Sequence, residues 1–272
     1  MNQSFSLQKN ATYHTLDFSI CTIVNDMEEY EVMKKSFIEK GFIDNCEYII
    51  ADNCKGNQFD AYQAIAHFLK IAKGEFIIIV HQDVRAIDDR NTLNNCLTEL
   101  QNKDSNWAIC GNAGGRGYHQ NILHISYPSH SDKSPGLPVR VKTLDENLLV
   151  IKRATNITIS PNLAGFHLYG TDICIIANFL GYSCYVIPFM IEHLSKGNIT
   201  SLKKDEGNFI NKYGEKMKIG FLQTTCTQFY LSNSTFKNKL YNTKFVFFII
   251  KQFQRYPYLF SKDKIKSVHT KF

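Results

Sequence analysis

Blocks of apolar residues and amphipathic stretches follow one another in turn along the first part of the chain. Continuous apolar runs are typical of strands covered on both faces, whereas apolar residues three and four apart predict one face of a helix. The predicted strands are residues 18–24, 47–51 and 76–84, and the predicted helices are residues 28–39 and 61–72, ended by Gly41 and Gly74. This order predicts a parallel, doubly wound α/β sheet.

The third predicted strand runs into a polar cluster, His81-Gln82-Asp83. Ligands in open α/β sheets bind at the carboxyl ends of the strands, so these side chains stand where chemistry is usually done. If the extended conformation continues to Val84, His81 and Asp83 project to the same side and can face one bound cation. The simpler reading is that Asp83 only ends the strand, because aspartate favours turns.

The middle of the chain shows a less regular pattern. Residues 93–100 predict a helix, residues 107–110 and 139–150 extended chain, residues 111–117 (GNAGGRG) a flexible turn and residues 126–138, with three prolines, a loop. The glycines of this turn do not have the spacing G-x-G-x-x-G, and the chain has no Walker lysine loop. The sequence therefore argues against a dinucleotide site and against a P-loop.

A second group of polar residues surrounds a predicted helix near residue 170. Thr171 predicts the N-cap of a helix that runs from Asp172 to residue 180 and is followed by Gly181. Asp172 then either complements the helix dipole or, kept ionised by that dipole, acts as a general base toward a sugar hydroxyl. His167 precedes it by five residues and could assist the base or bind substrate.

Residues 182–192 predict an extended run that ends at His193, and Pro188 within it indicates an edge position or a bend. The face of this strand that carries His193 is apolar, so a hydrogen-bonded core histidine is one reading. The other reading is a second ligand for the cation at Asp83. A carboxylate, an imidazole and two diphosphate oxygens together hold a divalent ion well.

The composition is that of a globular protein, and its 272 residues suffice for one catalytic α/β domain with an appendage. The eight cysteines include no C-x-x-C pair, which argues against a zinc knuckle and a disulfide framework. The first ten residues hold no apolar core of a signal peptide, and no stretch approaches the roughly 20 apolar residues of a membrane span. We therefore expect a cytoplasmic protein.

The basic charge is concentrated in a C-terminal tail. Residues 234–272 hold nine lysines and arginines against one acid, which leaves residues 1–233 close to −2 of the overall +6. The tail also carries an apolar run at residues 245–250 and further aromatic residues, Phe253, Tyr256, Tyr258 and Phe260. This combination predicts either a peripheral anchor on an anionic membrane surface, at the inner face of the cytoplasmic membrane, or a helix docked on the domain. A nucleic-acid partner is not expected.

Short motifs occur in a fixed order over about residues 19–198. They are residues 20–25 (ICTIVN), 48–53 (YIIADN), 61–63 (AYQ), 72–75 (AKGE), 81–84 (HQDV, a variant of D-x-D), 144–148 (LDENL), 166–172 (FHLYGTD), 181–182 (GY) and 193–197 (HLSKG). As a set they resemble the inverting glycosyltransferases of the GT-A fold, specifically the family-2-like bacterial enzymes that build surface polysaccharides. The resemblance implies an α/β fold with a mostly parallel nucleotide-binding sheet flanked by helices.

The resemblance also implies roles for individual residues. Asp83 and His193, with His81 beside them, would bind Mn²⁺ or Mg²⁺ on the donor diphosphate. The nucleotide-binding positions that it implies are Ile23, Val24, Asn25, Asp52, Asn53 and Gln82. Many relatives carry two acids as Tyr-Asp-x-Asp, and because Gly170 replaces the first of them, the base role falls on Asp172. His167, Gly115 and Arg116 could border the acceptor, although residues 114–116 could equally be a simple surface turn.

The implied reaction transfers a sugar from a nucleoside-diphosphate sugar to a saccharide or lipid-linked acceptor in surface polysaccharide synthesis. Two alternatives stay open. A sugar nucleotidyltransferase would need a glycine-rich, basic loop after the first strand, where this chain has residues 25–28 (NDME). A catalytically degenerate GT-A fold could instead serve as a membrane-surface adaptor, which the glycine at position 170 would favour.

Overall fold

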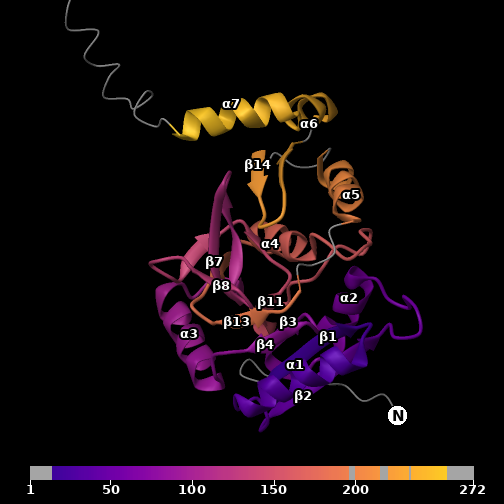
Figure 1. Cartoon of the computed structure of the whole chain (residues 1–272), viewed down its shortest axis with the longest axis vertical. Helices are drawn as coiled ribbons and strands as arrows, with labels where there is room; N and C mark the ends of the chain where they lie inside the picture. The colour runs from indigo at the N-terminus through magenta and orange to yellow at the C-terminus, as the bar shows by residue number, and fades with distance from the viewer. Residues whose placement is uncertain (1–13, 196–199, 215–219, 233, 256–272) are drawn as a thin grey trace, which may run out of the picture.

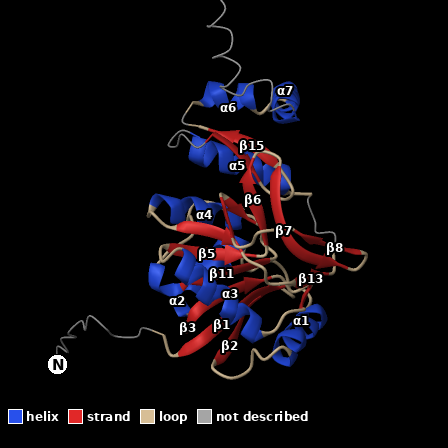
Figure 2. Cartoon of the chain, turned by 90° about the vertical axis from the view of Figure 1, so that its left-hand side faces the viewer, coloured by secondary structure: helices blue, strands red, loops and turns tan. Residues whose placement is uncertain are grey.

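The structure is a computed structural model that describes residues 14–195, 200–214, 220–232 and 234–255. It consists of a seven-stranded sheet, a six-stranded sheet and a two-stranded hairpin, with helices packed around them (Figures 1 and 2). The seven-stranded sheet has the order β2-β1-β3-β11-β5-β12-β9. Its strands are β1 Leu16–Val24, β2 Cys46–Asp52, β3 Gly74–Val80, β5 Trp107–Gly111, β9 Val139–Val141, β11 Leu148–Lys152 and β12 Ser183–Val186.

Parallel pairing dominates the side of this sheet that the first three strands form. β1 pairs in parallel with both β2 and β3, and β12 pairs in parallel with β5. β11 lies antiparallel between β3 and β5, and β9 closes the edge antiparallel to β12. The predicted class, an α/β sheet flanked by helices, is therefore confirmed, although the sheet is mixed, with three parallel and three antiparallel pairings.

Aspartates begin three of the helices that cover the sheet. The four helices before residue 180 are α1 Met27–Glu39, α2 Ala61–Ile71, α3 Arg90–Lys103 and α4 Tyr169–Phe179. Asp26, Asp60 and Asp89 accept hydrogen bonds from the first free backbone N–H groups of α1, α2 and α3, which stabilises each start. Gly41, at a φ of 90°, follows α1 as predicted. Gly74 begins β3 instead of ending α2. A Cβ there would lie 2.5 Å from the backbone nitrogen of Ser19, so the close approach of β1 requires glycine at this position.

A second, six-stranded sheet holds most of the segments that the sequence left irregular. Its path is β10-β6-β7-β13-β4, with β8 paired to β7. The strands are β4 Val84–Ala86, β6 Ala113–Gly117, β7 Gln120–Tyr127, β8 His130–Lys133, β10 Thr143–Leu144 and β13 Ile191–His193. The predicted turn at 111–117 and part of the predicted loop at 126–138 were therefore wrong. The glycines of β6 permit close packing, since a Cβ on Gly114 would lie 2.3 Å from the carbonyl oxygen of Thr143.

Two predicted single strands are each divided between the two sheets. The apolar run that begins in β3 ends at Val80, residues 81–83 turn, and β4 continues in the second sheet. Likewise, β12 ends at Val186 and β13 begins at Ile191, with Pro188 in the bend between them. β13 then pairs antiparallel with β4, which brings His193 opposite Val84.

A short 3-10 turn, Arg153–Thr155, follows β11 and contacts β3. The last elements build the end of the molecule that lies away from β1 and β2 (Figures 1 and 2). They are α5 Leu202–Gly214, β14 Gly220–Gln223, β15 Gln228–Leu231, α6 Thr235–Tyr241 and α7 Lys244–Arg255. α7 contacts the body through Phe247, whose ring stacks on that of Tyr118 at 5.8 Å and whose carbonyl oxygen accepts a hydrogen bond from the Tyr118 hydroxyl. Tyr256, Tyr258 and Phe260 lie outside the described residues.

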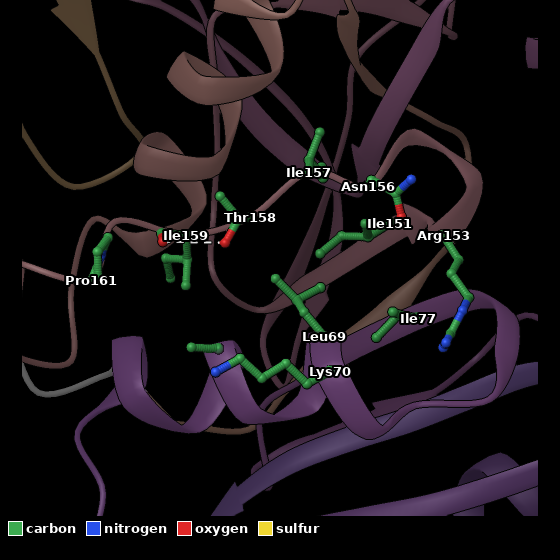
Figure 3. Close-up of a pocket in the computed structure, with 11 residues that line it drawn as sticks. Leu69, Lys70, Ile77, Ile151, Arg153, Asn156, Ile157, Thr158, Ile159 and Pro161 are labelled. Atoms are coloured by element: carbon green, nitrogen blue, oxygen red, sulfur yellow. Dashed lines mark hydrogen bonds between the residues drawn. The ribbon is translucent and has the colours of Figure 1, made fainter. Parts of the chain in front are cut away.

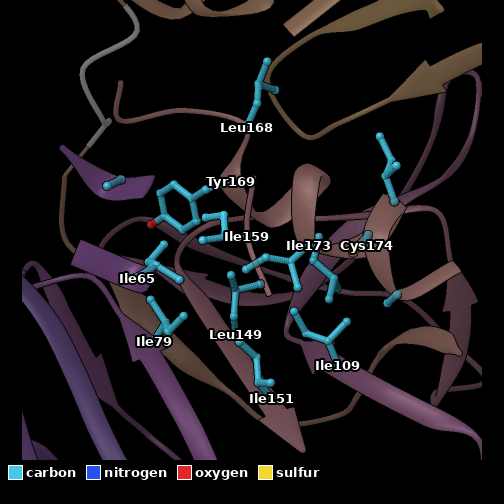
Figure 4. Close-up of a cluster of buried hydrophobic side chains, with 14 of the residues drawn as sticks. Ile65, Ile79, Ile109, Leu149, Ile151, Ile159, Leu168, Tyr169, Ile173 and Cys174 are labelled. Atoms are coloured by element: carbon cyan, nitrogen blue, oxygen red, sulfur yellow. The ribbon is translucent and has the colours of Figure 1, made fainter. Parts of the chain in front are cut away.

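Two apolar cores lie on the two faces of the large sheet. Alternate residues of β3 divide between them, with Ile77 and Ile79 in one core and Ile78 and Val80 in the other. Figure 4 shows the first core, in which α2 and α4 cover the strands and Leu149 contributes from β11. This alternation is the period of a strand buried on both faces, as the continuous apolar run predicted. Within the described residues, no helix is both long and apolar enough to cross a membrane.

Candidate active site

Three side chains of the types that bind metal ions, called here the metal-ligating cluster, meet at the carboxyl end of β3. The ligand atoms of His81, Asp83 and His193 all lie within 4.8 Å of one another. His193 Nε2 is 3.4 Å from Asp83 Oδ2, and His81 Nδ1 is 3.8 Å from Asp83 Oδ1. The β4–β13 pairing brings residues about 110 positions apart together, and the backbone N–H of Leu194 donates to the carbonyl of Asp83. The geometry thus brings together the three residues that the sequence proposed as ligands.

The charges within this cluster favour an ionised carboxylate between two imidazoles. Burial opposes ionisation of Asp83, but the neighbouring imidazoles of His193 and His81 and the hydroxyl of Ser195 hold its pKa well below the ordinary value. Burial lowers the pKa of His81 and also acts to lower that of His193, where the neighbouring Asp83 outweighs it and raises the pKa. The cluster therefore presents an anionic oxygen flanked by nitrogen donors.

The cluster has the chemistry of a divalent cation site. His193 is only 8% exposed, and among the described residues its Nε2 atom makes no well-aligned hydrogen bond, although it lies 3.4 Å from Asp83 Oδ2. His81 Nε2 is instead hydrogen-bonded to the hydroxyl of Tyr169 at 2.9 Å, which orients the ring with Nδ1 toward Asp83. One carboxylate and two imidazoles suit Mn²⁺ at least as well as Mg²⁺.

Gln82 lies in the same turn, but its side chain is directed away from the cluster and bonds the end of β1 and the start of α1. Its side-chain oxygen accepts hydrogen bonds from the backbone N–H groups of Asn25 and Asp26, at 2.8 and 3.1 Å. Its amide nitrogen donates to Asn25 Oδ1 at 2.6 Å and to Glu29 Oε2 at 2.7 Å. Gln82 therefore joins the metal-ligating turn to the edge where a nucleotide is expected.

The proposed nucleotide residues lie at the carboxyl ends of β1 and β2. Val24, fully buried, is in register with Asp52, while Asn25 and the Asp52 side chain are exposed and Ile23 is half-buried. The Asp52 carboxylate accepts a hydrogen bond from the backbone N–H of Cys54 at 2.9 Å, and this bond holds its pKa below the ordinary value. Asp52 is thus an exposed, ionised acceptor next to the turn that Gln82 fixes.

Asn53 has a different place from the one expected of a ligand-binding side chain. It is buried, and its side-chain oxygen accepts from the N–H groups of Gln58 and Phe59 while its nitrogen donates to the carbonyl of Phe59. These bonds close the loop that follows β2. Asn53 therefore fixes the conformation of the loop after β2 and does not itself face the expected nucleotide position.

Asp172 lies in the interior. The helix α4 begins at Tyr169 after Leu168, a residue with a φ of 67°, so the predicted N-cap at Thr171 was wrong. The Asp172 side chain is 0% exposed, and its carboxylate accepts hydrogen bonds from the N–H and hydroxyl groups of Ser160 and from the hydroxyl of Tyr213. Burial raises its pKa despite these bonds. The structure shows Asp172 bracing α4 against its neighbours, and its catalytic role stays a prediction.

Two adjacent acids that the sequence analysis gave no role, Asp145 and Glu146, lie beside the metal-ligating cluster. The main-chain oxygen of Glu146 is 3.3 Å from the hydroxyl of Tyr169, which in turn bonds His81. Burial and the charge of Asp145 raise the pKa of Glu146 to about 8, and Asp145 accepts a hydrogen bond from the hydroxyl of Thr225. The only indication of these residues in the sequence was the adjacent pair of acids within a segment predicted to be extended.

The three residues proposed to border the acceptor have unequal positions. His167 is half-buried just before α4, close enough to His81 to act on its pKa. Arg116 is exposed on β6. Gly115 lies under β14, because a Cβ there would be 1.7 Å from the carbonyl oxygen of Gln223. Only the first two are therefore placed where a ligand could reach a side chain.

A separate cavity of about 440 Å³ opens between α2 and residues 151–161 (Figure 3). Its lining is largely aliphatic, with Lys70 and Arg153 at its border, and it shares no residue with the His81, Asp83 and His193 cluster. It is therefore distinct from the site described above.

Sequence comparison finds a curated relative, the protein "ATP synthase subunits region ORF 6" of Fuscovulum blasticum. The two are 35% identical over 191 residues, a match that covers 67% of this chain and 77% of the relative. The chain belongs to the family of this ORF 6 protein. No protein-family model matches the sequence. The name of the relative describes a gene region, so the function of this ORF 6 family member has to be inferred from its site.

Comparison with solved structures identifies the fold. The mannosyltransferase PcManGT from Pyrobaculum calidifontis, solved in complex with GDP-Man and Mn²⁺, superposes with a TM-score of 0.50 at 12% identity, covering 79% of this chain and 70% of PcManGT. TarS of S. aureus gives a TM-score of 0.47 at 11% identity, covering 73% of this chain and 40% of TarS. The likeness to PcManGT gives this ORF 6 family member a fold of the GT-A type, as the sequence predicted.

Proposed function

We propose that this protein is a metal-dependent glycosyltransferase that moves a sugar from a nucleoside-diphosphate sugar to a hydroxyl group of an acceptor. The observation that carries the proposal is the convergence of His81, Asp83 and His193 at the carboxyl end of β3, next to the edge of β1 and β2, within a GT-A fold. The likeness in fold to a mannosyltransferase complexed with GDP-Man and Mn²⁺ is consistent with it.

The nucleoside would lie along the carboxyl ends of β1 and β2. The exposed Asp52 carboxylate, ionised at neutral pH, offers an acceptor for N–H or O–H groups of a base or ribose. Asn25 is exposed beside it, Ile23 and Val24 would lie beneath the nucleoside, and Gln82 links Asn25 to the turn of residues 81–83. Asn53 would act indirectly by fixing the loop after β2.

Asp83 and His193, with His81, would hold Mn²⁺ or Mg²⁺. When bound, the ion would offset the charge that grows on the leaving nucleoside diphosphate. The chain itself prepares the ligands, because Ser195 bonds the carboxylate of Asp83 and Tyr169 orients His81. The reaction would be a single displacement with inversion, in which a base takes the proton of the acceptor hydroxyl. Two acids are candidates for that base, Asp172 from the sequence and Glu146 from the structure.

A membrane surface is the proposed location of the acceptor, which would be a saccharide or a lipid-linked saccharide of surface polysaccharide synthesis. Phe245 and Phe248 of α7 are 70% and 60% exposed, one helical turn apart, and Lys244 and Lys251 flank them in exposed positions. Aromatic groups between cations suit a helix that lies on anionic lipid. The protein would then be peripheral at the inner face of the cytoplasmic membrane.

The proposed function is tested by thermal shift with UDP-, GDP-, CMP- and dTDP-sugars, each with and without Mn²⁺. A ligand at 100 times its dissociation constant adds about 2.7 kcal/mol to the stability of the folded state, which this method resolves. We expect one class of donor to raise the melting temperature with Mn²⁺ and to do so less in EDTA. Stabilisation that is equal in EDTA, or absent for every donor, would contradict the proposal.

Asp83→Ala should abolish the Mn²⁺-dependent part of this stabilisation, because it removes the only carboxylate of the cluster. Asp44→Ala is the matched control. Asp44 is an exposed aspartate in the loop before β2, at the end of the sheet opposite the cluster. If both variants respond to donor and Mn²⁺ as the parent does, the cation is not held at Asp83.

A further inference from the structure

The start of α4 contains a glycine against which a carboxyl group is packed. Gly170 lies in the first turn of this helix, where a Cβ would be 2.5 Å from the carbonyl oxygen of Leu144 and 3.6 Å from Oε1 of Glu146. The backbone of the segment 144–146 therefore approaches the helix more closely than any residue other than glycine allows. As a consequence, the Glu146 carboxyl lies in the space toward which a side chain at position 170 would project.

The surroundings of Glu146 are those of a poised acid–base group. Taken as a whole, the residue is half-buried beside the first turn of α4. Burial, with the charge of Asp145, raises the pKa of its carboxyl to about 8, and the nearby backbone N–H groups of Gly170 and Leu168 only partly offset this rise. A carboxyl that titrates near the working pH can both accept and hold a proton, as general base catalysis requires.

A short relay of contacts sets the position of Glu146 relative to the metal-ligating cluster. Tyr169 bonds His81 through its hydroxyl and lies 3.3 Å from the main-chain oxygen of Glu146. On the other side of the acid pair, the exposed Cys226 is near enough for the charges of Asp145 and Glu146 to raise its pKa. Glu146 thus lies between the cluster and the loop 224–227.

We propose that Glu146 is the general base of the transfer reaction, an assignment that rests on the proposed function. The acceptor O–H bond breaks and its proton passes to the Glu146 carboxylate. The acceptor oxygen forms a bond to the anomeric carbon of the donor, and the bond from that carbon to the diphosphate oxygen breaks. The nucleoside diphosphate leaves with the electron pair.

The other two acids in reach are engaged in the fold. The Asp172 carboxylate is fully buried and accepts hydrogen bonds from Ser160 and Tyr213. That of Asp145 accepts from the hydroxyl of Thr225 and from the backbone N–H of Asn147. Glu146 differs in that no side chain among the described residues is shown bonding its carboxyl, which packs against the first turn of α4 instead.

The test uses the full-length chain and the donor that thermal shift identifies, with release of nucleoside diphosphate measured from pH 5.5 to 9.5. Water serves as the acceptor, so no acceptor needs to be known. We expect Glu146→Gln to lower turnover on the order of 100-fold or more while donor still shifts the melting temperature as in the parent. The parent rate should rise with pH toward about 8, and this rise should be absent in the variant.

Three comparisons make the outcome decisive. Glu99→Gln, an exposed acid on α3, should keep the parent rate and pH profile. Glu146→Asp should recover part of the turnover, since it restores a carboxylate. If Glu146→Gln keeps turnover within a few fold and Asp172→Asn abolishes it with donor binding intact, the base is Asp172 and this inference is overturned. If the parent neither binds nor hydrolyses any donor, the proposed function itself fails, which the thermal-shift screen shows separately.

Discussion

At the scale of single residues, His193 is the ligand whose contribution to metal preference can be isolated. It is a nitrogen donor from β13, whereas the carboxylate of Asp83 comes from the turn after β3. Mn²⁺ accepts imidazole more readily than Mg²⁺ does. We expect His193→Ala to weaken the stabilisation by donor and Mn²⁺ and to reduce the advantage of Mn²⁺ over Mg²⁺. The exposed His67 on α2 provides the control variant, His67→Ala.

Asp172 should matter for stability. In Asp172→Asn the new amide group would face the donors of Ser160 or Tyr213, and a buried group would lose its partner. We expect a loss of about 1–3 kcal/mol in the free energy of unfolding, measured by urea denaturation near neutral pH. A variant as stable as the parent would show that these bonds do not brace α4.

Glu146 should make stability depend on pH. Its pKa is about 8 in the folded chain against an ordinary value of 4.5, so the folded state binds more protons than the unfolded state between these values. Stability from this group is therefore complete below pH 4.5 and falls as pH rises toward 8. Glu146→Gln should flatten that part of the stability profile, followed by denaturant midpoint against pH. Glu99→Gln should leave it unchanged, and an unaltered slope in Glu146→Gln would refute the assigned shift.

At the scale of elements, the sequence predicted best where burial alone decides the structure. β1 and β3 are largely apolar and buried, and the apolar spacing predicted α1 and α2. β6 and β8 were missed because their residues are glycines or polar, and partners distant in sequence hold them in the sheet. Local pattern cannot report such pairing.

The glycines of β6 can test this dependence on distant partners. A Cβ on Gly115 would lie 1.7 Å from the carbonyl oxygen of Gln223, so Gly115→Ala must displace β14. We expect a loss of about 1–3 kcal/mol in the free energy of unfolding. Gly207→Ala in α5, where nothing lies within 4 Å of the added Cβ, should instead gain roughly 0.5–1 kcal/mol. Equal effects of the two changes would contradict the packing described for β6.

The candidate site shows the same division between local and distant information. Asp83 and His193 were found because each ends an apolar strand, a feature of local sequence. Glu146 was not found, because its importance depends on the approach of the segment 144–146 to Gly170, which only the folded chain shows. A residue next to a glycine-permitted contact has no periodic signature in the sequence.

At the scale of the whole molecule, the proposed membrane contact depends on α7. We expect the rest of the domain to fold without this helix. α6 is tied to the body by Asn238 and Asn242, which bond Ser232 and Tyr230 of the β15 segment, so a chain that ends at residue 233 should be less stable. A chain that ends at Thr243 keeps these bonds.

We therefore expect the chain that ends at Thr243 to bind donor as the full chain does and to lose sedimentation with vesicles of anionic lipid. Salt should weaken sedimentation of the full chain. As a control that keeps the helix, Phe245→Ser with Phe248→Ser should have a similar effect on vesicle binding. Sedimentation that persists without α7 would place the membrane contact elsewhere, and loss of donor binding would show that α7 supports the domain.

The turn of residues 81–83 also bears on how donor preference could be re-engineered. Its central glutamine is fastened to the start of α1, while the histidine and the aspartate on either side face the cluster. The short turn therefore fixes the distance between the proposed nucleoside position and the proposed cation, whichever sugar the donor carries. Substitutions meant to change the donor sugar are best made outside residues 81–83, because a change within them would move the diphosphate and the nucleobase together.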